Sequence, residues 1–193
     1  MGETARREFL AARVAQQNFA ASLLGVPASG LQAAYACPVC GSGPDIVHGQ
    51  PGYLLDGGPA PLLLSASRAS GWVLLAAVVR PEAGLRLGVD LESGARTEFR
   101  GFDNVALSPR EKRHLDAMEP ERRGFERVRL WARKEAWLKM TGEGLRLNPD
   151  LLDVLDSPRR PDPELYDIRL PASIRGRKLP QALAAAIAMG RGA

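Results

Sequence analysis

The segment Leu85–Glu92 constrains the fold more than any other, because apolar and polar residues alternate strictly along it. Its apolar positions are Leu85, Leu87, Val89 and Leu91. Side chains alternate across a strand, so this pattern predicts a β-strand with one buried face. Asp90 and Glu92 would leave the opposite face together, with Cα atoms roughly 6.5–7 Å apart. Carboxylates this close raise each other's pKa unless a cation compensates, and a hard divalent cation prefers oxygen ligands.

Apolar periodicity and helix-breaking residues predict a mixture of further helices and strands. The expected helices are Thr4–Leu24, a short one that is capped by Ser108 and ends near Met118, and a longer one from Pro120 to Met140. The expected strands are Tyr53–Leu55, Leu62–Ser65, Trp72–Val79, Leu151–Leu155 and Tyr166–Leu170, with a turn at Arg68–Gly71. Residues 28–61 are otherwise expected to be irregular. Intrinsic propensity predicts a helix for the alanine-rich segment Ala182–Met189.

The first helix is expected to be amphipathic. Its apolar face would comprise Phe9, Leu10, Val14, Phe19, Leu23 and Leu24, which recur at helical spacing. Gly25 and Pro27 should end it.

Composition and charge narrow the class of protein without choosing a function. The chain has 193 residues, of which 45% are hydrophobic and 25% charged, as in ordinary globular proteins. A net charge of +4 favours anionic partners. No apolar run reaches the roughly 20 residues of a membrane span, so we expect no membrane partner and a cytoplasmic location. Nucleic-acid binding is not expected either, because Trp131 and Trp137 lie at helical spacing, as core residues do, and no basic-aromatic groove is evident.

Two cysteines and a histidine lie close together in the sequence. Cys37 and Cys40 form a Cys-Pro-Val-Cys stretch, and His48 follows shortly after. A zinc knuckle normally has four ligands, and the other histidine, His114, is distant. We therefore expect a loop with two reduced thiols rather than a zinc site or a redox dithiol.

On the long helix, Trp131, Glu135, Leu138 and Lys139 fall on one stripe. An exposed Glu–Lys pair would stabilise the helix by only about 0.2–0.5 kcal/mol. The spacing alone therefore leaves a structural pair and a functional pair both open.

A histidine-dependent hydrolase is hard to build from two histidines.

Taken together, the segments Leu87–Glu92 and Trp131–Lys139 resemble the two signatures of the phosphopantetheinyl transferases. Phe102–Glu111 and Thr141–Leu145 resemble the segments between and after those signatures. The likeness is to the longer, surfactin-activating class and covers most of the chain. It implies an α+β fold of two similar halves, residues 1–80 on the coenzyme A side and residues 81–193 with the catalytic motifs, and a monomer with the active site between the halves. It also implies that Ala182–Met189 is a strand.

The resemblance implies an activity as well. Such an enzyme moves 4'-phosphopantetheine from coenzyme A to a serine of an acyl or peptidyl carrier protein and releases 3',5'-ADP. Asp90, Glu92 and Glu135 would hold Mg²⁺, Lys139 would neutralise phosphate, and Glu135 would also act as the base on the carrier serine. Phosphoryl-type transfer needs alignment and charge neutralisation rather than a protein nucleophile, which fits these residue types.

For coenzyme A binding, the resemblance points to Asp90, Lys139 and the Ser65–Ala69 segment, in which Ser67 matches the family and Arg68 replaces a histidine. Gln50 stands where the family usually has a basic residue, and Glu8 falls near a commonly basic position. These departures favour an alternative, a degenerate member that binds coenzyme A or a carrier without turnover. The basic residues that could compensate are Arg6, Arg7 and Arg13, for which we favour a solvated helix face.

The segment Glu98–Met118 is the expected docking region for the carrier. Its apolar residues are Phe99, Phe102, Val105 and Leu107, and its basic residues include Arg110, Lys112 and Arg113. A docking surface and a core position are equally consistent with the apolar set.

Overall fold

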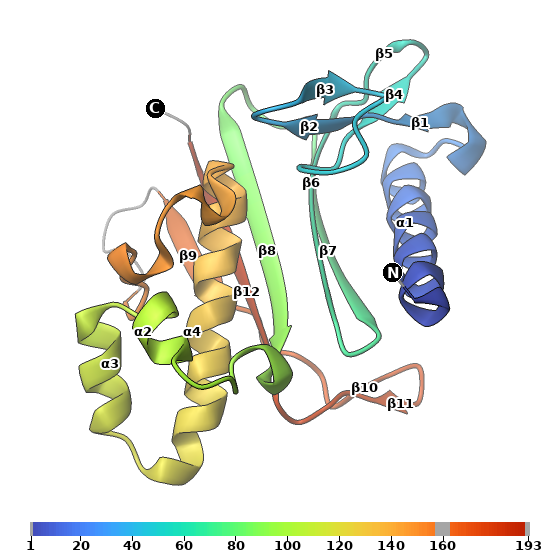
Figure 1. Ribbon diagram of the computed structural model, residues 1–193. Coiled ribbons are helices and arrows are strands. Elements are labelled where there is room, and N and C mark those ends of the chain that lie inside the picture. The colour runs from blue at the N-terminus through green and yellow to red at the C-terminus, as the bar shows by residue number, and fades with distance from the viewer. Residues whose placement is uncertain (1, 157–162, 192–193) are drawn as a thin grey trace.

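The computed structural model describes residues 2–156 and 163–191, which form a mixed fold of helices and antiparallel sheets (Figure 1). The helices of this part are α1 (Glu3–Leu24), α2 (Phe102–Ala106), α3 (Pro109–Asp116) and α4 (Pro120–Thr141). The strands are β1 (Leu31–Ala33), β2 (Tyr35–Cys37), β3 (Gly41–Gly43), β4 (Tyr53–Leu55), β5 (Gly58–Pro59), β6 (Leu62–Ala69), β7 (Trp72–Val79), β8 (Leu85–Ser93), β9 (Glu164–Asp167), β10 (Ser173–Ile174), β11 (Arg177–Lys178) and β12 (Leu183–Arg191). None of the helices described is both long and apolar enough to cross a membrane.

The C-terminal part is built on an antiparallel sheet of strand order β8-β12-β9, with α4 lying across one face (Figure 1). The strand predicted at Leu85–Glu92 is confirmed as β8, and Leu87, Val89 and Leu91 are buried. Gly88 lets α4 approach this strand, because a Cβ atom there would lie 1.9 Å from the carbonyl oxygen of Ala136. The close contact fixes how the helix sits over the sheet.

The segment Ala182–Met189 is a strand, β12, as the family resemblance implied, and the helix predicted from propensity is wrong. Its backbone pairs with β8 on one side and β9 on the other, with Ala186 opposite Asp90. The buried alanines are Ala184, Ala185, Ala186 and Ala188. Their small side chains suit a central strand beneath a closely packed helix, so tertiary pairing overrides local propensity.

Around α3 and α4, a buried ion pair organises the chain. The predicted capping box is confirmed, because the hydroxyl of Ser108 and the carboxylate of Glu111 each accept a hydrogen bond from the other's backbone N–H. Glu111 also lies 2.8 Å from Lys134, and neither side chain is exposed. The strand predicted at Leu151–Leu155 is wrong. The carbonyl of Leu152 accepts a hydrogen bond from Lys134, and the N–H of Val154 donates one to Glu111. Side chains, rather than a neighbouring strand, therefore supply the hydrogen-bond partners of this backbone.

The N-terminal part places α1 beside the β6-β7 hairpin (Figure 1). The helix and its end at Gly25 are as predicted, and its predicted apolar face is partly right, because Phe19 and Leu24 pack against the core. Leu10, Val14 and Leu23 are exposed, whereas the buried residues are Gln16, Ala20 and Ala21. Gln16 donates hydrogen bonds to the hydroxyls of Tyr35 and Tyr53, so a polar contact and two small residues complete a buried face that was expected to be apolar.

Residues 28–61 contain more strand than the sequence predicts. The strand at Tyr53–Leu55 is confirmed as β4, but it belongs to a sheet of order β1-β4-β5, and β2 pairs with β3 beside it. Each of these strands has only two or three residues, too few to show a period of two.

The remaining strands differ from prediction at their ends. Strand β7 has the predicted bounds, while β6 continues past Ser65 to Ala69. The turn is therefore only Ser70-Gly71, both at positive φ, and Arg68 lies in the strand rather than in the turn. Strand β9 ends at Asp167, so the strand predicted at Tyr166–Leu170 is only partly right.

Candidate active site

The centre of the candidate site is the face of β8 that carries Gly88, Asp90 and Glu92, which all point to one side of the strand. This is the side on which α4 packs, as the close approach of Gly88 to Ala136 requires. Asp90 and Glu92 are almost completely buried, at 2% and 1% exposure. The sequence therefore predicted correctly that two carboxylates share one face of a strand.

Asp90 joins three elements of the fold. Its Oδ1 atom accepts a hydrogen bond of 2.7 Å from the hydroxyl of Ser67 on β6 and one of 2.5 Å from Nζ of Lys139 on α4. Lys139 also donates to the carbonyl of Val89. The Oδ2 atom of Asp90 is buried and has no hydrogen-bond partner among the described residues. The two oxygens of this carboxylate thus differ, because one is held by two donors and the other is buried without a partner in the described residues.

Glu92 has the same division between its two oxygens. Its Oε1 atom lies 3.0 Å from Arg96, while Oε2 is buried without a partner in the described part of the chain. Burial, and then the charge of Asp90, raise the pKa of Glu92 to about 7. A nearby cation would therefore stabilise the charged form of Glu92.

Glu135 lies on α4, one turn before Lys139, and is partly buried. Burial and the charge of Asp90 raise its pKa, which Lys139 and Arg96 partly offset. Glu135 and Asp90 therefore influence each other electrostatically. The oxygens of the three carboxylates are nevertheless not as tightly gathered as those of a filled metal site. In the described residues, the set of three Cys, His, Asp or Glu ligand atoms that lie within 4.8 Å of one another is Cys37, Cys40 and His48.

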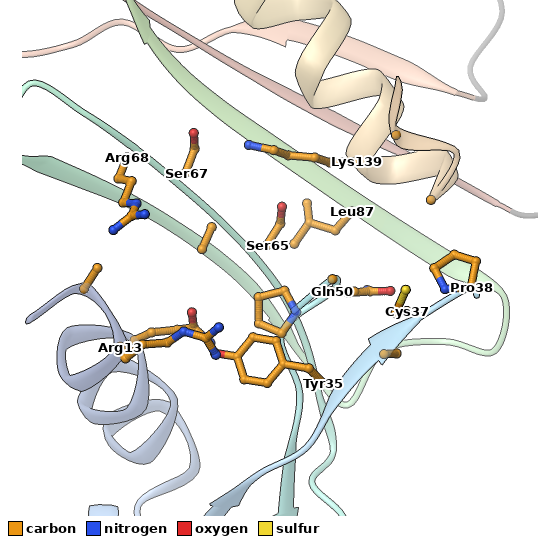
Figure 2. Close-up of a pocket in the computed structure, with 18 of the residues that line it drawn as sticks. Arg13, Tyr35, Cys37, Pro38, Gln50, Ser65, Ser67, Arg68, Leu87 and Lys139 are labelled. Carbon is orange, nitrogen blue, oxygen red and sulfur yellow. The ribbon is translucent and has the colours of Figure 1, made fainter. Parts of the chain in front are cut away.

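A cavity of about 640 Å³ opens beside Ser67 and Lys139 (Figure 2). It lies among α1, β2, β6, β8 and α4, and both hydrogen-bond donors to Asp90, Ser67 and Lys139, line it. Arg68 lines it too, with its guanidinium carbon 5.2 Å from the centre of the Phe9 ring. The structure thus brings Ser67 and Lys139 to Asp90, whereas Arg68 faces another part of the cavity (Figure 2).

Arg13 is a residue of this cavity that the sequence did not assign to it. Its guanidinium stacks 3.9 Å above the centre of the Tyr35 ring and donates to the carbonyl of Val47. The expected solvated position is therefore wrong for Arg13, although it holds for Arg6 and Arg7, which are exposed. Helical periodicity could have given a hint, since Arg13 lies one turn after Phe9 and three residues before buried Gln16.

Residues 86–188 match the sequence model of the 4'-phosphopantetheinyl transferase superfamily, which is more than half of the chain. The chain belongs to this superfamily. Members transfer phosphopantetheine and use coenzyme A as their substrate, so coenzyme A and a carrier protein are the partners that the family implies. No curated protein matches the chain.

The superfamily match divides the site residues into two groups. Asp90, Glu92, Glu135 and Lys139 fall inside the matched residues. Ser67 and Arg68 precede them, as do Arg13 and the rest of the N-terminal wall of the cavity. The acidic groups thus come from the family's shared region, and much of the cavity comes from the part that the match leaves out.

Proposed function

We propose that this chain transfers the 4'-phosphopantetheine group from coenzyme A to a serine of a carrier protein with the help of Mg²⁺. The observation that carries the proposal is the position of Asp90. This buried carboxylate is bonded to Ser67 and Lys139, both of which line the cavity. A substrate held in the cavity would therefore place its phosphates beside Ser67 and Lys139, the two donors to Asp90.

The cavity has the size and charge that a nucleotide-containing substrate needs. Its volume of about 640 Å³ falls within the usual range for small-molecule sites. Arg13, Arg68 and Lys139 approach it from α1, β6 and α4, so cations surround it on several sides. Arginine guanidinium groups can bind phosphate bidentately, and we assign the phosphates of coenzyme A to these residues. The charge that Gln50 lacks would be supplied by Arg13 across the cavity.

The buried oxygens fit a divalent cation. Asp90 Oδ2 and Glu92 Oε2 have no partner among the residues described, and Mg²⁺ prefers oxygen ligands. Together with Glu135 they would hold Mg²⁺, which when bound would neutralise negative charge on the pyrophosphate. Glu135 would have to turn toward the other two carboxylates, because the three do not form a compact set in the present arrangement.

Glu135 is the group that we assign as the base. Its raised pKa makes it a better proton acceptor than an ordinary glutamate near neutral pH. It would take the proton from the serine hydroxyl of the carrier as the serine oxygen forms a bond to the phosphopantetheine phosphorus. The bond between that phosphorus and the bridging oxygen of the pyrophosphate breaks, and 3',5'-ADP leaves. Lys139, already beside Asp90, would stabilise the negative charge on the phosphates.

We further propose that the chain is a monomer of the surfactin-activating type, with residues 1–80 and 81–193 as its two halves. The support is that each half has a long helix against a pair of antiparallel strands. Helix α1 accompanies β6 and β7, and α4 accompanies β8 and β12. Strands β6 and β8 run side by side between the halves, where the hydroxyl of Ser65 accepts a hydrogen bond from the N–H of Val89.

The carrier would dock on the segment that links β8 to α4. Phe99 and Val105 are 55% and 59% exposed there, whereas Phe102 and Leu107 are buried. The apolar residues of this segment are thus divided between a surface and the core. We assign Phe99 and Val105 to the contact with a carrier helix, which needs an apolar centre.

Incubation of the purified protein with coenzyme A, Mg²⁺ and several apo carrier proteins tests the proposal. Intact-mass spectrometry should detect addition of one phosphopantetheine group to at least one carrier, and not to its serine-to-alanine variant. No mass gain with any carrier would contradict transfer. If calorimetry then detects coenzyme A binding, the alternative of a degenerate member that binds without turnover is favoured.

A further inference from the structure

A second cluster of ligand-type side chains lies at the β2-β3 hairpin, where Cys37 lines the cavity. Cys37 ends β2, Cys40 lies just before β3, and His48 is in the loop that follows that strand. Their sulfur and nitrogen atoms all lie within 4.8 Å of one another, and Cys40 Sγ is 3.4 Å from His48 Nε2. Zinc–sulfur and zinc–nitrogen bonds of about 2.3 and 2.0 Å place tetrahedral ligands about 3.5–3.8 Å apart. The cluster is therefore close to the size of a zinc site without any movement.

The backbone between the two cysteines forms the tight turn of the β2-β3 hairpin. Cys37 pairs with Gly41 across the β2-β3 hairpin, and Gly41 has a φ of 89°, which favours glycine. The turn thus brings the two cysteine sulfurs to within 4.8 Å of each other.

The position of His48 is set by backbone contacts of the neighbouring residues as well as by its side-chain contact with Cys40. Gln50 and Ala36 exchange two backbone hydrogen bonds of 2.8 and 2.9 Å, which fix the end of the loop against β2. Gly49, which lies between His48 and Gln50 in the chain, has a φ of 88°. A Cβ atom there would lie 2.2 Å from the carbonyl oxygen of Ala36. Only glycine permits this approach, and the approach carries His48 to the cysteines.

We infer that Cys37, Cys40 and His48 bind a zinc ion and leave its fourth position open to water or an added ligand. Two sulfur donors and an imidazole select zinc over Mg²⁺ or Ca²⁺, which prefer oxygen. The chain has only two cysteines and two histidines, and His114 lies on α3, so no further cysteine or histidine can complete the set. Three protein ligands with an open position is the pattern of reactive zinc sites rather than of closed structural ones.

A bound ion would stabilise one wall of the cavity. Cys37, Gly41 and Gln50 all line the cavity, and they belong to the hairpin and the loop that the ion would link. The coordination of the cluster does not depend on the proposed transferase activity, so the site can be tested in the absence of coenzyme A and a carrier.

Cobalt substitution of the full-length protein, untagged and reduced, tests the inference. We expect one equivalent of zinc on elemental analysis. After its removal, Co²⁺ should give thiolate-to-metal charge-transfer absorption and the intense visible bands of tetrahedral cobalt, both abolished by added Zn²⁺. Cys40→Ser and His48→Ala should each weaken Co²⁺ binding by at least about 100-fold, since even the loss of an outer-shell partner costs 10–100-fold. His114→Ala is the matched control and should bind Co²⁺ as the wild type does.

The wild-type spectra carry the test even if a variant fails to fold. Absence of charge-transfer absorption in the reduced wild type would overturn the inference. So would unchanged spectra in both ligand variants. A Cys37–Cys40 disulfide in the isolated protein, with no metal uptake after reduction, would also overturn it and identify the pair as a redox dithiol.

Discussion

The two parts of the molecule contribute to the candidate site in different ways. Residues 85–191 have a large core in which α4 packs on β8 and β12, and the core continues through α2 and α3. Residues 2–80 have a small core, made of Ala20, Ala21, Leu31, Tyr53 and Leu64, and most of their strands are very short. The carboxylates Asp90, Glu92 and Glu135 come from the first part. Most of the cavity wall, with Arg13 and Arg68, comes from the second.

The C-terminal part thus positions the carboxylates, and the N-terminal part supplies most of the wall that would bind the substrate. Buried carboxylates with raised pKa values need a rigid framework, because burial and mutual repulsion both oppose their charged forms. Cations that bind a flexible substrate can come from a less densely packed wall. We therefore expect substitutions in the C-terminal part to affect chemistry and stability strongly, and those in the N-terminal part to affect substrate affinity more mildly.

The largest effect is expected for Glu135→Gln, which keeps the size of the side chain and removes the proposed base. The transfer rate should fall by at least about 100-fold, the lower end for loss of general-base catalysis. The matched control is Glu121→Gln, an exposed position in the first turn of the same helix. Discontinuous mass-spectrometric assays would measure both rates. A rate for Glu135→Gln equal to that of the control would show that Glu135 is not the base.

The framework itself can be broken at Gly88. Gly88→Ala should lower the free energy of unfolding by about 3 kcal/mol or more, because the new methyl group overlaps the backbone of α4 at Ala136. Gly124→Ala is the control, since a Cβ there meets nothing within 4 Å and the position is helical. That substitution should raise stability by about 0.5–1 kcal/mol. Urea unfolding of both variants decides whether the contact of β8 with α4 is as tight as described.

Because Glu92 is buried beside Asp90, the stability of the metal-free protein should depend on pH. Burial, and then the charge of Asp90, raise the pKa of Glu92 from an ordinary value of 4.5 to about 7, so the folded state holds an extra proton between these values. Its contribution therefore falls as pH rises from 4.5 to 7. Relative to Glu92→Gln, the wild type should lose roughly 2 kcal/mol of unfolding free energy between pH 5 and pH 8. Parallel stability curves for the two proteins would contradict the raised pKa.

The smallest effect is expected for Arg13→Ala in the N-terminal wall. Loss of one partly exposed cation should weaken coenzyme A binding by about 3- to 10-fold, with little change in the maximal transfer rate. Arg7→Ala on the same helix is the control, because Arg7 is exposed and does not line the cavity. Calorimetric titration with coenzyme A measures both. Equal affinities for the two variants would place the phosphates elsewhere.

The same contrast explains how much the sequence could predict. The alternation along β8, the capping box of α3 and the bounds of α4 are local patterns, and the structure confirms them. Local patterns failed where a distant group decides the outcome. The segment at Leu151–Leu155 is organised by Lys134 and Glu111, and β12 is a strand because β8 and β9 pair with it.

Within the candidate site, the residues on signature segments could be predicted, as could Ser67 and Arg68 on the cavity wall, whereas Arg13 could not. The signatures gave Asp90 and Lys139, which the fold joins by a hydrogen bond. Arg13 could not be assigned, because its place in the cavity depends on stacking with Tyr35, whose short strand has no detectable period. The closeness of His48 to Cys40 depends on the backbone pairing of Ala36 with Gln50, which is equally invisible in the sequence.

The measurement that tests the account most directly is calorimetric binding of coenzyme A with and without Mg²⁺. If Asp90 and Glu92 hold the ion against the pyrophosphate, Mg²⁺ should tighten coenzyme A binding by at least about tenfold, and coenzyme A should tighten Mg²⁺ binding equally. In Asp90→Asn the tightening should disappear. Coenzyme A affinity that is the same with and without Mg²⁺ would contradict the metal-bridged site.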